Sequence, residues 1–421
     1  MRPLTILEVP TGRALRPCRS KVMRILVLDG NQNQAVASVR SLADAGHEVL
    51  VGEASPWSKA GWSRLCRGTF QYPNPEEDAA GFIARVSEIA KQQLGTLVLP
   101  MTEATTLPVS AHRDVLLSEG ARLVLPDHAD VLRAVNKNEM VQLAASIGIA
   151  VPKTVTVSNL EDARRASQAL TFPVVLKPRS SVETVSDGGV RVTGRPRYAK
   201  DPPELLARFG ELIQICSQML AQEFVDGEGV GYFVLMCHGE LRAEFAHRRI
   251  RDVHPTGSGS AVRVSVEPDP DVRATSLAIL KALRWHGVAM VEFRQAPGGP
   301  PVFMEVNGRF WNSLPLACYS GADFPAWLAK LAENGDIEGK LQFRSGVVCR
   351  WLLGDFRHVI EVLKGAPAGY PRPYPGRWQT ILSVLTPVRG TYHDNFQWRD
   401  PLPELGDWLN FVERAFQKLR S

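Results

Sequence analysis

The segment that most restricts the fold of this chain spans residues 287–311, where two apolar stretches flank a pair of glycines. Gly298 and Gly299 lie between the stretches, so the pattern predicts a β-hairpin. Glu292 lies on the first arm and Glu305 on the second, opposite or nearly opposite each other. Two like charges that face one another destabilise a sheet unless a cation lies between them. The hairpin must therefore fold where its carboxylates meet a counter-ion.

Polar residues of the second arm share one face of the predicted strand. Side chains alternate along a strand, so Glu305, Asn307 and Arg309 point the same way. The carboxylates of Glu292 and Glu305 and the amide oxygen of Asn307 form a donor set that suits Mg²⁺ bound to nucleotide phosphates. The alternative is that Glu292 and Glu305 form ordinary ion pairs with Arg294 and Arg309. The hairpin alone leaves both interpretations open.

Length and charge limit the classes of protein. A chain of 421 residues with 44% hydrophobic residues predicts two or three domains with substantial cores. Residues 1–22 carry +4 of the net charge of +5, so the rest is nearly neutral and argues against a nucleic-acid partner. No apolar run is long enough to predict a membrane span.

We expect translation to start at Met23, with residues 1–22 disordered or artefactual; a short organelle-targeting arm is the alternative.

The six cysteines are scattered and include no CxxC pair. Such spacing is typical of reduced thiols in a cytoplasmic protein, and it argues against a disulfide framework or a zinc site. The histidines likewise show no metal-ligand spacing.

The hydrophobic pattern divides the chain into segments. Residues 23–127 alternate strands and helices and predict a doubly wound, Rossmann-like parallel sheet, although the single glycine after the first strand excludes a GxGxxG fingerprint. We expect residues 128–220 to form a connector and a first α+β subdomain, and residues 221–335 a second. Residues 336–421, rich in aromatic residues and proline, form a C-terminal accessory segment that we expect to pack between domains.

Two further features suggest phosphate and nucleotide contacts. Lys177 ends an apolar strand and precedes a Ser/Gly-containing loop, residues 179–189, which could close over a bound phosphate. Gln222 and Glu223 end another strand before a turn at Gly227, which could contact an adenine edge. The alternatives are a solvated lysine and a plain strand end.

Four arginines surround a Gly/Ser loop. Arg248, Arg249 and Arg251 precede the loop and Arg263 follows it, an arrangement that could clamp a carboxylate or phosphate. A solvated charged face is the alternative, since strand alternation places Arg248 and Arg249 on opposite sides.

Five ordered blocks resemble the ATP-grasp superfamily over about residues 23–335. They are "NK" at 136–137, "VVLKP" at 174–178, "QEFVDGEG" at 222–229, "VEF" at 291–293 and "MEVNGRFW" at 304–311. The segments "HRRIR…PTGSGS" and "NGRFWNSLPLA" are most similar to the carboxylate–amine ligase branch, which is carbamoyl-phosphate-synthase-like and lies near D-aspartate ligases.

The resemblance implies that ATP and Mg²⁺ bind between two α+β subdomains that follow the parallel-sheet domain. Residues that would hold ATP phosphates are Lys137 and Lys177. Residues that would form the adenine and ribose contacts are Gln222, Glu223, Val225 and Glu228. Residues that would hold Mg²⁺ are Glu292, Glu305 and Asn307. Residues that would stabilise the transferring phosphoryl group are Arg249, Arg263 and Arg309.

The implied activity is ligation of a carboxylate, often of an amino acid, to an amine through an acyl phosphate, with release of ADP and phosphate. Alternatives are activation of bicarbonate by the same machinery and a non-catalytic nucleotide-binding protein. Implied partners are small-molecule substrates, and ligases of this kind are commonly homodimers. This chain departs from the family in two places. The 179–189 loop has fewer glycines than in many members, and Gly229 stands where the ribose-binding acid usually lies.

Overall fold

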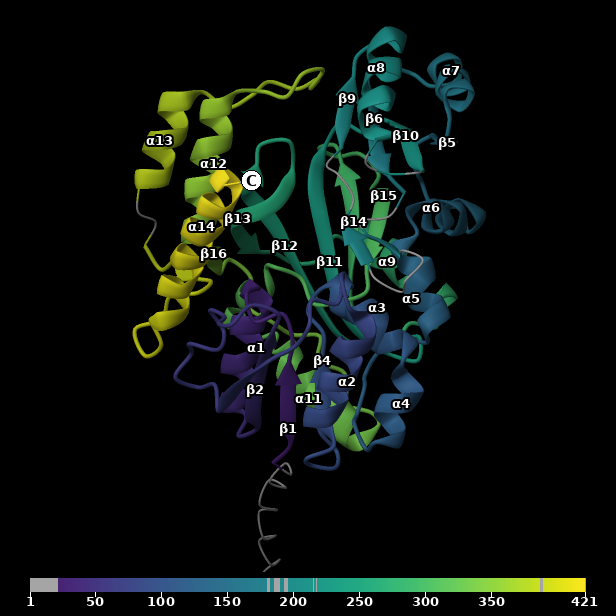
Figure 1. The fold of residues 1–421 in the computed structure, drawn as a ribbon. Coiled ribbons are helices and arrows are strands. Elements are labelled where there is room, and N and C mark those ends of the chain that lie inside the picture. Colours follow the sequence, from purple (N-terminus) through teal and green to yellow (C-terminus); the bar gives the residue numbers. More distant parts are fainter. Residues whose placement is uncertain are drawn as a thin grey trace, which may run out of the picture.

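A four-stranded parallel sheet forms the N-terminal part of the computed structural model, which describes residues 22–179, 182–184, 190–192, 196–214, 216, 218–386 and 389–420 (Figure 1). Its strand order is β3-β2-β1-β4. The strands are β1 (Arg24–Val27), β2 (Glu48–Glu53), β3 (Gly68–Gln71) and β4 (Leu97–Leu99).

Helices cover both faces of this sheet. Ile25 and Val27 pack with α1 (Asn33–Asp44), whereas Leu26 and Leu28 pack in a separate cluster with α2 (Ala79–Ala90) and α4 (Arg113–Ser118). Helix α3 (Glu103–Ala111) follows β4, and α5 (His128–Val135) and α6 (Lys137–Ser146) lead into the next part. Alternate residues of β1 thus enter different cores, as the doubly wound prediction requires.

An antiparallel sheet of order β5-β10-β6-β9 forms the first subdomain. It comprises β5 (Thr154–Val157), β6 (Val174–Pro178), β9 (Arg197–Ala199) and β10 (Met219–Glu223), with α7 (Leu160–Ala169) and α8 (Pro202–Leu212) against one face. A short antiparallel pair follows β6: β7 (Val182–Thr184) lies within the loop predicted to cover phosphates, and β8 (Val190–Val192) comes directly after it.

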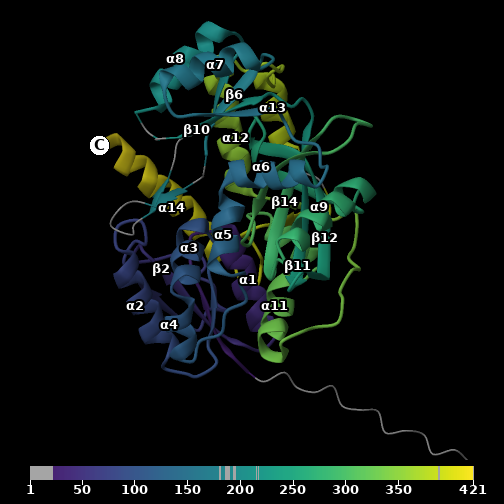
Figure 2. The same ribbon diagram turned by 90° about the vertical axis from the view of Figure 1, so that its right-hand side faces the viewer.

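A seven-stranded sheet forms the centre of the molecule, with strand order β15-β14-β11-β12-β13-β16-β17 (Figures 1 and 2). Its strands are β11 (Glu228–Cys237), β12 (Glu240–His254), β13 (Ser258–Ser265), β14 (Gly287–Gln295), β15 (Val302–Asn307), β16 (Val348–Arg350) and β17 (Tyr392–His393). One face packs on α5, α6 and α9 (Pro270–Ala282), and the other on α1, α10 (Leu314–Tyr319) and α11 (Phe324–Asn334).

The C-terminal segment extends this central sheet through β16 and β17, which come from residues beyond 335. It also contains three helices, α12 (Leu352–Lys364), α13 (Arg377–Leu385) and α14 (Leu402–Arg420). The segment is joined to the N-terminal part and to β13 by buried ion pairs of Arg40, Lys59 and Arg263 with aspartates of residues 394–407. Residues far apart in the sequence therefore share one interior.

The predicted fold class, a doubly wound parallel domain followed by two α+β subdomains, is confirmed. Within the described residues, none of the helices combines the length and apolar character needed to cross a membrane. No disulfide joins cysteines there either.

Candidate active site

The predicted hairpin forms, and its two carboxylates face each other. β14 and β15 pair antiparallel with Glu292 directly opposite Glu305. The row continues across the sheet, because Gly231 of β11 lies opposite Glu292 on one side and opposite His247 of β12 on the other. Directly opposed residues of neighbouring strands point to the same face. The two glutamates therefore share a sheet face with Gly231, which contributes no side chain of its own.

Each carboxylate has a cationic partner from another element. Lys137 Nζ, at the start of α6, lies 3.0 Å from Glu305 Oε2. Arg249 Nη2, on β12, lies 3.1 Å from Glu292 Oε2 on β14. Burial alone would raise the pKa of Glu305, but the ammonium groups of Lys137 and Lys177 outweigh it and lower that pKa to about 2. Glu305 is thus stabilised in its charged form.

Glycine allows Arg249 to reach across the middle strand. β11 lies between β12 and β14, and a Cβ atom at Gly229 would lie only 2.8 Å from Arg249 Nη1. The guanidinium therefore occupies the space that a side chain at position 229 would take. The sequence resemblance expected an acid at this position, and the glycine found there leaves room for the Arg249–Glu292 contact.

Asn307 and Arg309 complete this surface. Asn307 is 8% exposed, and its Nδ2 donates to Glu305 Oε1 at 3.2 Å. Arg309 follows the end of β15, and its Nη2 donates to Asn307 Oδ1 at 3.0 Å and approaches Glu103 Oε1 at 3.4 Å. These contacts bear on the ion-pair interpretation of the hairpin. The glutamates do form ion pairs, but with Lys137 and Arg249 rather than with Arg294 and Arg309.

Lys177 lies in the first subdomain and is 8% exposed at the end of β6. Its Nζ donates to Gln222 Oε1 at 2.8 Å, and Gln222 Nε2 donates to Thr154 Oγ1 at 2.9 Å. Burial, and next the charge of Lys137, lower the pKa of Lys177 to about 7. The Gln222 side chain thus positions Lys177, which differs from the adenine contact implied by the resemblance.

The predicted adenine hinge follows β10. Glu223 Oε1 accepts from Thr171 N at 2.8 Å, so this side chain holds a neighbouring loop of its own subdomain. Val225 is half-buried after the strand, and Glu228 is exposed at the start of β11. Glu228 lines a cavity of about 160 Å³ together with Arg249, and the adenine contact of this hinge stays a prediction.

The C-terminal segment supplies a neighbour of this hinge that the sequence did not reveal. Residues 365–376, which we call the strap, run beside it. Tyr370 packs edge-on against Phe224 with ring centroids 6.5 Å apart, and Arg372 Nε lies 3.1 Å from Asp226 Oδ1. The strap matches the predicted role of packing between domains. Only the aromatic and proline composition signalled it, and composition does not say which surface a segment covers.

The four-arginine clamp predicted from the sequence does not form. Arg248 is exposed, Arg249 contacts Glu292, and Arg251 Nη1 contacts Asp355 Oδ1 at 2.5 Å. Arg263 has no exposed surface and is bonded to both carboxylate oxygens of Asp394. We therefore correct the assignment of Arg263 as a phosphoryl-stabilising residue, because a guanidinium sealed in an ion pair cannot reach a substrate. Of the predicted catalytic arginines, Arg249 and Arg309 lie on the site surface.

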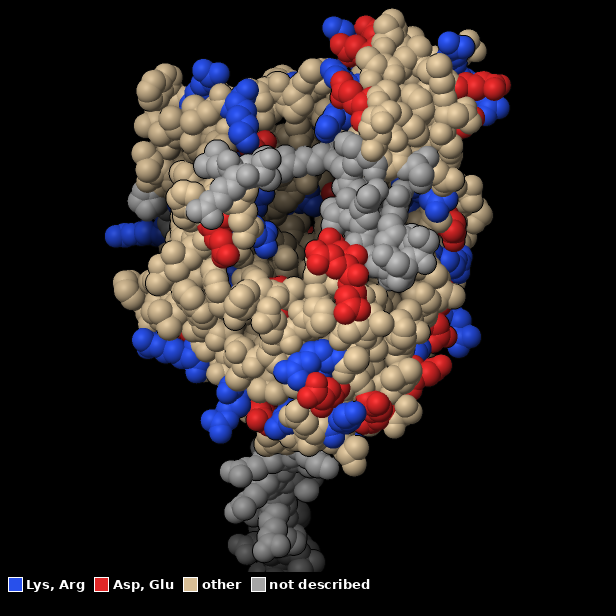
Figure 3. All heavy atoms as spheres, viewed as in Figure 1, with Lys and Arg blue, Asp and Glu red and all other residues tan. Residues whose placement is uncertain are grey.

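The arrangement fits a nucleotide with Mg²⁺. Glu292, Glu305 and Asn307 provide oxygen donors on adjacent strands, and such hard oxygen ligands are those that Mg²⁺ prefers. Arg249 Nε is buried without a hydrogen-bond partner within the described residues, so this surface still has a polar atom to satisfy. On the side of the molecule seen in Figure 3, the surface is hollowed between the C-terminal helices and the first subdomain. Basic and acidic side chains lie at the rim of this hollow. Of the loop predicted to close over phosphates, residues 180–181 and 185–189 lie outside the described residues.

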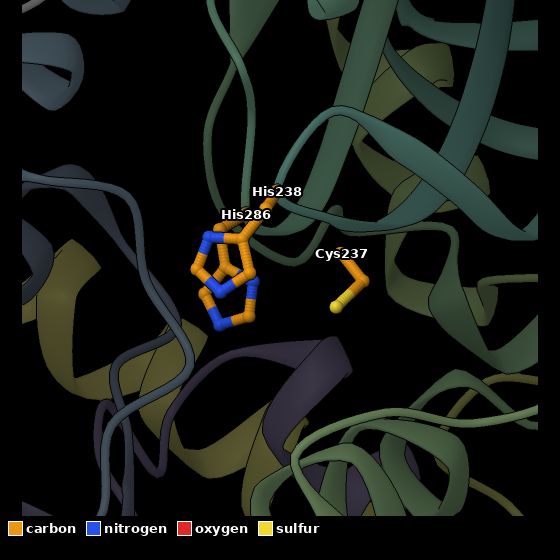
Figure 4. A group of neighbouring side chains, drawn as sticks. All are labelled: Cys237, His238 and His286. Carbon is orange, nitrogen blue, oxygen red and sulfur yellow. The ribbon is translucent and has the colours of Figure 1, made fainter.

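A second group of potential metal ligands lies at the other end of β11. Atoms of Cys237, His238 and His286 lie within 4.8 Å of one another (Figure 4). The imidazole rings of His238 and His286 stack face to face, with centroids 4.1 Å apart and planes 10° apart. The Cys237 thiol donates to the Gly335 carbonyl at 3.7 Å. Stacked rings direct their nitrogens side by side rather than toward one centre, so this group is better explained as packing around the turn that follows β11.

Comparisons with known proteins identify similar folds. The family model described as "ATP-grasp in the biosynthetic pathway with Ter operon" matches residues 215–354. Biotin carboxylase from Campylobacter jejuni is similar over 78% of this chain and 74% of its own, with a TM-score of 0.62 at 15% identity. L-amino acid ligase from Bacillus licheniformis is similar over 76% of both chains, with a TM-score of 0.57 at 16% identity.

A third similar structure carries ligands. It is the biotin carboxylase domain of 2-oxoglutarate carboxylase from Hydrogenobacter thermophilus, solved with MgADP and bicarbonate. It covers 77% of this chain and 73% of its own, with a TM-score of 0.61 at 14% identity. The resemblance predicted from the five sequence blocks is thus confirmed at the level of the fold.

Proposed function

We propose that this protein, which has the ATP-grasp fold, is an ATP-dependent ligase that joins a carboxylate to an amine. The observation that carries the proposal is the pair Glu292 and Glu305, held opposite each other by Arg249 and Lys137. Two partly buried carboxylates that lie side by side repel each other, which costs free energy. A bound Mg²⁺ ion would offset this repulsion, so the pair is best explained as a site for Mg²⁺ and phosphates.

Each residue of the site has a role in this reaction. Lys137 and Lys177 bind ATP phosphates, and the backbone of residues 223–225 with Glu228 contacts the nucleoside. Glu292, Glu305 and Asn307 would hold one or two Mg²⁺ ions, which would neutralise the charge of the phosphates. Arg309 orients the substrate carboxylate, and Arg249 steadies the transferring phosphoryl group. Positioning and electrostatics supply most of the rate enhancement in phosphoryl transfer.

The proposed reaction has two steps. A carboxylate oxygen of the first substrate attacks the γ-phosphorus of ATP, the bond to the bridging oxygen breaks, and ADP leaves. The nitrogen of the amine then attacks the acyl carbon, phosphate leaves with the electrons of the C–O bond, and a proton is lost from nitrogen. We place this activity in the cytoplasm, in agreement with the cysteine pattern, and expect small molecules as its only substrates.

The direct test is release of ADP from Mg·ATP by the full chain, screened against pooled carboxylic acids and amines. Release that requires one acid and one amine supports the ligase. Release that requires bicarbonate instead indicates the bicarbonate-activating alternative, which similar biotin carboxylases make worth including. Nucleotide binding without turnover in every pool indicates a non-catalytic protein.

Proton uptake by Lys177 on ATP binding tests its proposed phosphate contact without requiring turnover. With its pKa lowered to about 7, Lys177 is mostly neutral at about pH 8. A polyphosphate beside Nζ raises that pKa again, so binding of ATP without Mg²⁺ should take up about one proton at this pH. Calorimetry in buffers of different ionisation enthalpy measures this uptake.

The matched variant is Lys177→Met, which should bind ATP more weakly and without the proton uptake. Lys153→Met, at an exposed lysine of the same subdomain, serves as the control and should behave like the wild type. Equal uptake by the wild type and Lys177→Met would contradict the assignment of Lys177 to a phosphate.

A further inference from the structure

The first subdomain has a hydrophobic interior of its own. Its buried cluster consists of side chains from residues 155–221, and these side chains belong to none of the other clusters in the described part of the chain. Two chain segments connect the subdomain to the rest, one before β5 and one between β10 and β11. A unit with a separate core and two short connections can move as a rigid body unless other contacts hold it.

The strap, residues 365–376, supplies such contacts. Tyr370 packs edge-on against Tyr198 of β9, with ring centroids 5.0 Å apart, and also against Phe224 after β10. A Cβ atom at Gly369 would lie only 2.6 Å from the Tyr198 carbonyl oxygen, so the strap backbone lies directly against this edge strand. Figure 1 shows the segment between α12 and α13 extending across to β9.

Both ends of the strap belong to the C-terminal segment, which is fixed to the central sheet. Tyr374 Oη donates to the Glu361 carbonyl of α12 at 3.3 Å. Helix α12 is joined to β12, because Arg251 Nη1 contacts the buried carboxylate of Asp355 at 2.5 Å. The strap therefore bridges a fixed part of the molecule and the first subdomain.

A cavity of about 500 Å³ lies between the strap and the site surface. It is lined by strap residues, by Tyr198 of the first subdomain and by Arg294 of β14. Arg294 follows Glu292 by two residues on the same strand, so it points to the face that carries the predicted metal pair. Arg294 also lines the smaller cavity of about 160 Å³, together with Tyr370 and Arg372. The strap thus covers one side of the space between the two sheets.

The contacts of the strap with the first subdomain can break without unfolding either part. Arg372 and Asp226 form an ion pair whose side chains are 39% and 76% exposed, and such pairs contribute little. Tyr370 is only half-buried. Segments with few buried contacts open at a lower free energy than a core does. Prolines at positions 367, 371, 373 and 375 restrict the released strap, so it loses less conformational entropy when it docks again.

From these contacts we propose that the strap is a latch. Tyr370 and Arg372 hold the first subdomain against the rest of the molecule and thereby retain the nucleotide between the two sheets. They are positioning residues, since they act through the first subdomain and its Lys177 and not on the reacting atoms. The inference rests on the proposed function for the identity of the retained ligand, whereas the latch itself requires no ligand.

A distance measurement tests the latch in the free protein. Spin labels are attached through a keto-bearing amino acid introduced at two exposed positions, Glu161 on α7 and Lys281 on α9. Pulsed electron paramagnetic resonance then records the distance distribution in the full chain. The distribution should be narrow when Tyr370 is present. Tyr370→Ala should broaden it and add a second population, because the first subdomain is no longer held.

Nucleotide release measures the consequence of an open latch. The full chain is loaded with Mg²⁺ and a fluorescent ADP, then mixed with excess unlabelled ADP in a stopped-flow instrument. Tyr370→Ala combined with Arg372→Ala should release the fluorescent ADP about tenfold faster or more. Tyr370→Phe keeps the ring contacts and should release at a rate closer to the wild type than to the double variant.

Two controls exclude general effects on the C-terminal segment. Trp378→Ala removes an aromatic side chain that is 79% exposed on α13, outside the strap, and should change neither measurement. Thermal unfolding should be similar for the wild type and for each strap variant, because the strap contributes no side chain to the buried hydrophobic cores of the described residues. If Tyr370→Ala fails to fold, Arg372→Ala alters an exposed side chain and should shift both measurements in the same direction.

The outcomes separate this inference from the proposed function. Equal distance distributions for the wild type and the strap variants overturn the latch, whatever the chain binds. A broadened distribution in a protein that binds no nucleotide keeps the latch and rejects the ATP-dependent ligase. A broadened distribution with unchanged ADP release overturns the claim that the strap retains the nucleotide.

Discussion

Replacement of Glu305 by glutamine should lower the ligation rate by roughly 10²–10³-fold or more, a loss comparable to removal of one electrostatic contact to a transition state. The carboxylate is opposite Glu292, accepts from Asn307, and pairs with Lys137 at 3.0 Å. Glutamine keeps its shape and removes the charge that Mg²⁺ and Lys137 both require. ADP release at saturating Mg²⁺ measures the effect.

The control and the stability measurement make this result specific. Glu338→Gln alters a glutamate whose side chain is 88% exposed and should leave the rate unchanged. Thermal unfolding of Glu305→Gln checks that the variant is folded, since the amide oxygen can accept from only one of Lys137 and Asn307. Wild-type ADP release by a folded Glu305→Gln protein would reject the metal assignment.

The second large effect concerns stability rather than activity. Asp394→Ala should lower the free energy of unfolding by about 3–5 kcal/mol, because it leaves Arg263 buried without its counter-ion. Both side chains have no exposed surface, and Asp394 Oδ2 also accepts from Asn33 Nδ2 at 3.0 Å. Calorimetric unfolding measures the loss, and limited proteolysis should show earlier cleavage within the C-terminal segment.

Two variants make this prediction sharp. Asp44→Ala breaks the Arg399 ion pair, which joins the C-terminal segment to α1 at 2.6 Å, with the Arg399 and Asp44 side chains 55% and 48% exposed. Exposed pairs contribute about 0–1 kcal/mol, so this change should be small. Arg263→Met combined with Asp394→Leu removes both charges and should recover part of the loss. Equal effects of Asp394→Ala and Asp44→Ala would show that burial does not decide the strength of these pairs.

The hairpin was predictable because its information is local. Two apolar stretches, a glycine turn and strand alternation determine that Glu292 and Glu305 share a face, and the observed register has them directly opposite. The placement of Lys177 at a strand end is equally local. The βα alternation of residues 23–127 likewise predicted the parallel sheet.

Side-chain partners were less predictable. Gln222 and Glu223 lie at the expected strand end, yet their side chains bind Lys177 and the Thr171 backbone. A motif locates the backbone of a hinge, but the direction of each side chain depends on which neighbours the tertiary structure brings near. Glu103, the partner of Arg309, comes from a different domain and carried no motif.

By itself, the sequence determined the order of elements, the polar face of the hairpin and the blocks that resemble ATP-grasp proteins, because these depend on residues close together in the chain. Tertiary structure alone decided the use of the arginines. Arg249 and Arg263 lie directly opposite each other on β12 and β13, and both looked like anion ligands. One meets Glu292 on the site surface, and the other meets Asp394, which lies 131 residues away in the sequence. The charge of a guanidinium is local information, but the carboxylate that neutralises it is chosen by the packing of distant segments.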